Sequence, residues 1–69
     1  MTKKDYELIA EGIKTVNHLI INRKGVKLEY KNVLLTTVEA VAVELAYKLA
    51  LDNNKFDKER FLLACGITE

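Results

Sequence analysis

The side chains that most often carry out catalysis are scarce in this sequence. Cys65 supplies the single thiol and His18 the single imidazole. A nucleophilic enzyme needs a nucleophile, a base within hydrogen-bond reach and a group that orients the base. Cys65 falls beside Leu62 and Ala64 on an apolar helical face, where burial raises the pKa of a thiol and lowers its reactivity. We therefore predict that Cys65 is a packing residue and that His18 lies at the boundary of a helical face.

Metal and cofactor chemistry also lack their usual residue patterns. One histidine and one cysteine make half of a tetrahedral zinc shell, and no Cys-x-x-Cys pair occurs. The three glycines, at positions 12, 25 and 66, are too scattered for a phosphate-binding loop. Glu7 and Glu11 share a helical face, but neighbouring lysines make a solvated, salt-bridged surface the simpler interpretation. The sequence predicts no enzyme, no metal site and no cofactor.

A cluster of cations in the middle of the chain is the main alternative chemistry. It comprises Arg23, Lys24, Lys27 and Lys31, with Tyr30 among them. Such residues can neutralise phosphates and stack on a base, which suggests a small nucleic-acid-binding accessory protein. However, eleven Lys and Arg balance ten Asp and Glu, and a nucleic-acid binder normally has a large basic excess. We favour a solvated linker whose charges complement the C-terminus of the preceding helix.

Size and composition favour one small domain that associates with another chain. With 69 residues, the chain buries only about 60% of its unfolded surface, so a monomer is marginally stable. A single cysteine forms no intrachain disulfide, which leaves self-association as the expected supplement. No apolar run approaches the roughly 20 residues that span a bilayer, and the N-terminal residues are charged and amphipathic. We expect a cytoplasmic protein that does not enter membranes.

Apolar spacing predicts an all-α fold with helices over residues 3–22, 33–52 and 58–65. Thr2 and Asp5 form a capping-box pattern for the first helix, and Asn22–Gly25 supplies a basic last turn and a glycine stop. Asn53 and Asn54 are expected to end the second helix. Apolar residues recur at intervals of three and four in both long helices: Tyr6, Ile9, Ile13, Val16 and Ile20, then Leu34, Val38, Val41, Leu45 and Leu49, with Ala42 and Ala46 beside the second series.

The third predicted helix has strong signals at both ends. Asp57 is expected to cap its start, with Phe56 packing on Phe61 as a hydrophobic staple. Gly66 stands where a C-terminal cap glycine belongs, and Ile67 is expected to fold back onto the helix. We predict that the two long helices pack as an antiparallel pair and that this short helix closes one end around Phe56 and Phe61.

The segment between the long helices has two interpretations. Val26, Leu28 and Tyr30 alternate with charged residues, a period of two that is typical of a half-buried strand. That strand would pair across the Asn22–Gly25 turn in a hairpin near residues 18–30, making the fold α+β. We favour an extended linker over residues 26–31, because the helical stripe continues through Ile20 and an isolated hairpin is marginally stable. Asn32 or Thr36 would then cap the second helix.

The two ends of the chain carry sequence patterns that also occur together in other short proteins. The chain opens with Thr2-Lys3-Lys4-Asp5-Tyr6, and residues 52–61 read Asp-Asn-Asn-Lys-Phe-Asp-Lys-Glu-Arg-Phe. This resembles a family of very short open reading frames common in bacteriophage and prophage genomes. Asn54 stands where that family often has proline. The resemblance implies a phage origin, but the family carries no assigned activity, so no functional residues transfer from it.

The sequence favours a non-enzymatic protein-binding module. Several apolar residues lie outside the main helical faces, and apolar residues left outside one core usually mark an interface. We expect helix-mediated contact with a second copy, forming a homodimer, or with a host or phage protein. The alternatives are the nucleic-acid-binding protein described above and a minor virion component. The apolar residues outside the main faces are Leu8, Leu19, Ile21, Leu35, Val43 and Leu51.

Overall fold

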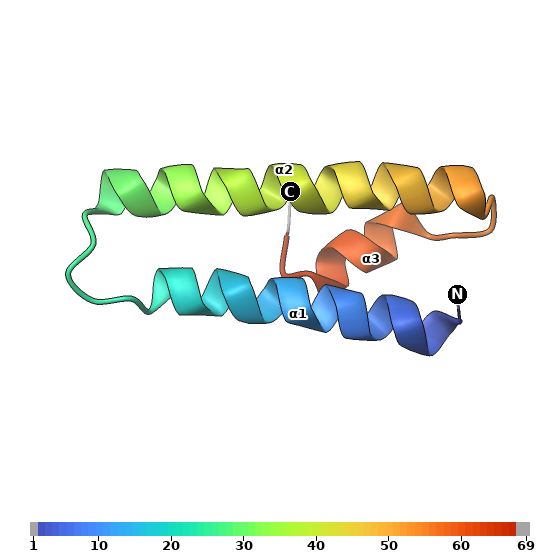
Figure 1. Cartoon of the computed structure of the whole chain (residues 1–69), viewed down its shortest axis with the longest axis horizontal. Coiled ribbons are helices and arrows are strands. Elements are labelled where there is room, and N and C mark those ends of the chain that lie inside the picture. Colours follow the sequence, from blue (N-terminus) through green and yellow to red (C-terminus); the bar gives the residue numbers. More distant parts are fainter. Residues whose placement is uncertain (1, 68–69) are drawn as a thin grey trace.

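The computed structural model describes residues 2–67 and contains three helices over that range. These are α1 (Lys3–Ile21), α2 (Leu28–Asp52) and α3 (Lys58–Ala64). α1 and α2 run antiparallel, and α3 lies against both at the end where α1 begins and α2 finishes (Figure 1). The prediction of an all-α fold is confirmed. The hairpin alternative is wrong, because residues 2–67 contain no strand.

Local hydrogen bonds explain where α1 begins and where α3 begins and ends. Thr2 and Asp5 form the predicted capping box, in which the Asp5 carboxylate accepts from Thr2 N at 2.9 Å. These hydrogen bonds to Thr2 lower the pKa of Asp5. Asp57 caps α3 by accepting from Arg60 N at 3.0 Å. Gly66 follows α3 with a φ of 80°, and Ile67 N donates to Leu62 O at 3.0 Å, which closes a Schellman motif.

The start of α2 differs from the prediction. α2 begins at Leu28 rather than near residue 33, so residues 28–31 form a helical turn and not an extended linker. The alternating pattern was misleading because it does not mark a buried strand face: Leu28 and Tyr30 are both exposed. Neither Asn32 nor Thr36 caps α2. Both lie inside it, and Thr36 donates to Asn32 O within the helix. Lys27 occupies the N-cap position without a side-chain cap hydrogen bond.

The hydrophobic core is small and concentrated at the α3 end. Three of its five buried apolar residues are alanines, and the largest side chain that is fully buried belongs to Cys65. Half-buried residues such as Tyr6, Leu45 and Phe56 surround them. Tyr6, Phe56 and Phe61 form a chain of aromatic contacts, with ring centroids 4.7 and 5.4 Å apart, which confirms the predicted staple. The five buried apolar residues are Ala10, Ala42, Ala46, Phe61 and Cys65.

The half of the α1–α2 pair that lies away from α3 is largely exposed to solvent. Within the described residues, none of the buried apolar side chains comes from residues 11–41. Many large apolar side chains are instead exposed there, on both helices and in several directions. α3 has only 7 residues and does not extend to this half (Figure 1). The exposed residues are Val16, Leu19, Ile21, Leu28, Tyr30, Val33, Leu34 and Val41.

Candidate protein-interaction surface

An apolar groove runs between α1 and α2 on the face that α3 does not cover. It has a volume of about 330 Å³ and is lined by residues of α1 and α2 alone. We call it the α1–α2 groove. A hollow of this size between two parallel ridges accepts the side chains of another helix. The groove is lined by Ile9, Gly12, Ile13, Val16, Thr37, Val38 and Val41.

The α1–α2 groove presents almost no polar group to a partner. Thr37 is its one polar lining residue, and the Thr37 hydroxyl already donates to Val33 O at 2.9 Å. Contact with an apolar surface therefore leaves no hydrogen-bonding group of the groove unsatisfied. Gly12 adds a notch: a Cβ built on it meets no atom within 4 Å. No other described residue fills the space beside Gly12, so another helix can approach closely there.

The predicted apolar stripes divide between the core and the groove. Ala42 and Ala46 are buried in the core, whereas Val41 is 59% exposed and Leu34 is 44% exposed. On α1, Val16 is 45% exposed although it belongs to the predicted stripe. These residues point toward the uncovered face, because positions separated by three, four or seven residues share one side of a helix. The groove is thus the continuation of the core surface that α3 leaves open.

Asn17, and not its neighbour Val16, is buried on α1 together with Ala10. It is 8% exposed, and its side-chain Nδ2 donates to Cys65 O at 3.3 Å. This bond ties α1 to the residue that caps the end of α3. Sequence reasoning missed Asn17, although its position four residues after Ile13 and seven after Ala10 is consistent with the buried side. Its polarity favoured Val16 as the core residue.

The cation cluster lies in the loop between α1 and α2 and in the first turn of α2 (Figure 1). Lys31 Nζ donates to Ile21 O at 2.9 Å, so this cation complements the C-terminus of α1 as predicted, although Lys31 lies in α2 and not in a linker. Arg23, Lys24, Lys27 and Tyr30 are exposed. A role of the cluster in nucleic-acid binding stays a prediction.

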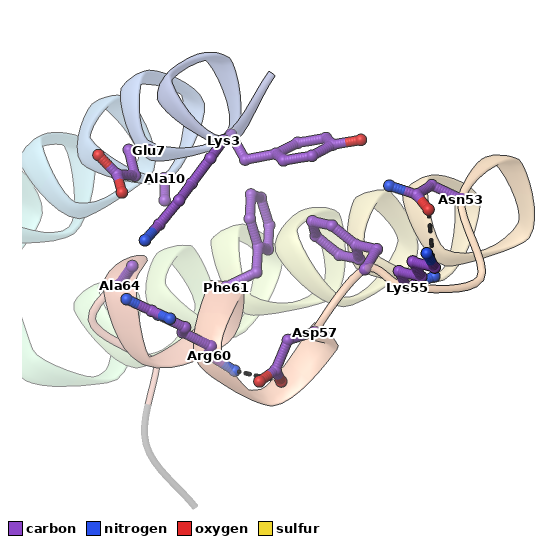
Figure 2. Close-up of a pocket in the computed structure, with 11 residues that line it drawn as sticks. Lys3, Glu7, Ala10, Asn53, Lys55, Asp57, Arg60, Phe61 and Ala64 are labelled. Carbon is purple, nitrogen blue, oxygen red and sulfur yellow. Dashed lines mark hydrogen bonds between the residues drawn. The ribbon is translucent and has the colours of Figure 1, made fainter. Parts of the chain in front are cut away.

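A second hollow of about 320 Å³ lies between α1, α3 and the loop that joins α2 to α3. Figure 2 shows Phe61 inside it, with Lys3 from α1 and Arg60 from α3 extending along the same side. Asp57, on the rim, already caps α3 through Arg60 N. Every charged residue that lines this hollow is exposed.

Cys65 and His18, the two residues considered as catalytic candidates, differ in exposure. Cys65 is fully buried, and this burial raises the pKa of its thiol to about 11. His18 is exposed on α1, as expected for a residue at the edge of an apolar face. Within residues 2–67, no group of three His, Cys, Asp or Glu side chains lies close enough together to hold a metal ion.

Comparisons with protein-family models, with curated proteins and with solved structures find no match to this chain. None of the helices in the described part of the chain is long and apolar enough to cross a membrane.

Proposed function

We propose that this chain is a non-enzymatic protein-binding module that acts through its helices, and that its first partner is a second copy of itself. The two copies meet at the α1–α2 groove and form a homodimer. The observation that carries the proposal is this apolar groove, open on the face that α3 does not cover. Docking two such faces completes the core of the uncovered half and produces a four-helix arrangement, a common way to bury two apolar helical faces.

The amount of exposed surface supports a dimer. The chain exposes 5493 Å², whereas a compact monomer of its 7.9 kDa mass exposes about 4,400 Å². The excess is on the order of 1,000 Å², close to the roughly 800 Å² that each partner contributes to a standard interface. A second copy pressed against the groove removes a comparable area from water.

The shape of the molecule points in the same direction. Its dimensions are 41 × 18 × 16 Å and its radius of gyration is 12.9 Å, compared with about 11 Å for a compact domain of this length. A rod of two helices in water has too little interior for its apolar residues. Two rods placed side by side make a thicker and more compact body, in which the same residues become interior.

The resemblance to short phage and prophage reading frames supports a phage origin, in which case the dimer acts in the cytoplasm of the infected host. A host or phage protein is the competing occupant of the groove. The nucleic-acid alternative is weaker because Lys31 is engaged at the end of α1. We place the interaction surface at the groove and not at the cations.

Two substitutions of β-branched residues on α2 test the proposal. Val41 lines the groove and is 59% exposed, whereas Thr36 is exposed and lies five residues earlier, about 140° around the same helix and away from the groove. Val41→Lys buries a charge in the dimer and is expected to shift the protein to monomer. Thr36→Lys, the matched control, is expected to keep the dimer. The molecular mass of each variant is measured by light scattering during size exclusion. Equal masses for the two variants contradict the proposal.

A further inference from the structure

We infer that the two copies lie antiparallel across the α1–α2 groove, so that each interhelical loop projects beside the α3 end of the partner. This inference rests on the proposed self-association and adds its direction. In an isologous dimer the same surface of both copies is used, and the two-fold axis then runs either along the helices or across them. The axis along the helices places both loops at one end, and the axis across them places the loops at opposite ends.

The position of Gly12 favours the axis across the helices. α1 covers residues 3–21, so Gly12 is its central residue, and it lines the groove. An axis across the middle of the groove places α1 against the partner's α1, with the two glycines facing each other. The space for an absent Cβ then allows the two backbones to approach closely, as small residues do at helix crossings. With the axis along the helices, α1 faces the partner's α2, and the two glycines do not meet.

The charges at the two ends of the groove favour the same arrangement. The loop end carries Arg23, Lys24 and Lys27, all exposed and without a salt bridge to another described residue. If both loops lay at one end, these three cations would face their three equivalents in the partner. Like charges brought together in this way oppose association.

The opposite end of the groove carries charges of both signs. Asp5 lies one turn before Ile9 on the groove side of α1, and Asp52 lies eleven residues, or about three turns, after Val41 on the groove side of α2. Exposed cations stand at this end as well: Lys3, Lys4, Lys55, Lys58 and Arg60. Antiparallel copies therefore place the basic loop of one chain beside an end of mixed charge that includes Asp5 and Asp52, instead of beside a second basic loop.

Distances between spin labels on the two copies test the direction. Leu28 and Leu51 stand near opposite ends of α2, and at 73% and 80% exposed they accept labels without loss of a charge. Cys65 is fully buried, so a label attaches selectively to Leu28→Cys or Leu51→Cys. Each chain carries one label, so every distance measured by pulsed electron resonance joins two copies.

Antiparallel copies predict a long distance in the Leu28→Cys dimer, on the order of 35 Å, the length of α2 at 1.5 Å per residue. Mixing chains labelled at Leu28→Cys and Leu51→Cys then adds a short distance, under about 20 Å, because neighbouring helix axes in a bundle lie 8–10 Å apart. A short distance in the Leu28→Cys dimer and a long one in the mixture overturn the inference while leaving the dimer intact. Absence of any coupling between copies overturns the proposed dimer as well.

Discussion

At the scale of single residues, the hydrogen bond from Asn17 Nδ2 to Cys65 O stands out because it joins residues 48 positions apart. Asn17 is the one buried polar side chain within residues 2–67. We expect Asn17→Ala to lower the free energy of unfolding by about 1–3 kcal/mol, because it removes the bond and leaves a carbonyl of the α3 cap without its partner. Urea denaturation at fixed protein concentration measures the change. Asn32→Ala, at an exposed position of α2, is the control and is expected to be close to neutral.

The buried thiol of Cys65 predicts a pH dependence of stability. Burial raises its pKa from 9.0 to about 11, so between these values the folded chain keeps the proton that the unfolded chain releases. Stability therefore falls as pH rises from about 9 to 11. Urea midpoints measured across this range are expected to fall more steeply for the unmodified chain than for Cys65→Ala. Parallel pH profiles for the two proteins would count against the burial of the thiol as its cause.

At the scale of elements, α3 is the short helix whose attachment creates the core. Phe61 is 4% exposed and packs on Phe56, whereas Leu63 on the same helix is 62% exposed. We expect Phe61→Ala to lower the free energy of unfolding by about 3–5 kcal/mol, as deletion of a buried aromatic ring does. Leu63→Ala, the matched control, is expected to change it by about 0.5 kcal/mol or less. Comparable losses in both variants would show that α3 is not held by its buried face.

Helix ends with strong local signals were predictable from sequence, and the start of α2 was not. The Thr2 and Asp57 caps and Gly66 act through hydrogen bonds to residues close by in the chain, and such patterns are visible in a sequence. α2 begins at Leu28 without a side-chain cap, so no local signal marked the position. Its first turn is supported instead by Lys31, whose bond to Ile21 O requires α1 to be in place.

The candidate site was predictable only in part, because both sides of the α2 stripe are apolar. Ala42 and Val41 are neighbours in sequence and therefore point about 100° apart on α2. Both sides carry apolar residues, and the residue types do not show which side α3 covers. α3 packs on the row of small residues, where two alanines allow close approach, and this choice leaves the larger residues at the open groove. The expectation of surplus apolar surface followed from composition, whereas its location required the packing of α3.

At the scale of the whole molecule, the two long helices extend beyond the part of the fold in which a core forms. Two helices of 19 and 25 residues extend well beyond the 7 residues of α3, and apolar side chains continue along the uncovered half. A chain of this size has little stability to spare, since a typical domain gains only about 0.05–0.15 kcal/mol per residue. Association through the α1–α2 groove covers the half that α3 does not reach.

The most direct test of this claim is the molecular mass of the unmodified chain in solution, measured by light scattering coupled to size exclusion. A homodimer has twice the 7.9 kDa mass of one chain, and we expect this mass at low and at moderate salt and down to micromolar concentration. The contact is mainly apolar, so salt is expected to change the mass little. A mass of 7.9 kDa at every concentration and at both salt levels would contradict the account, because the groove would then stay open to water without a second copy.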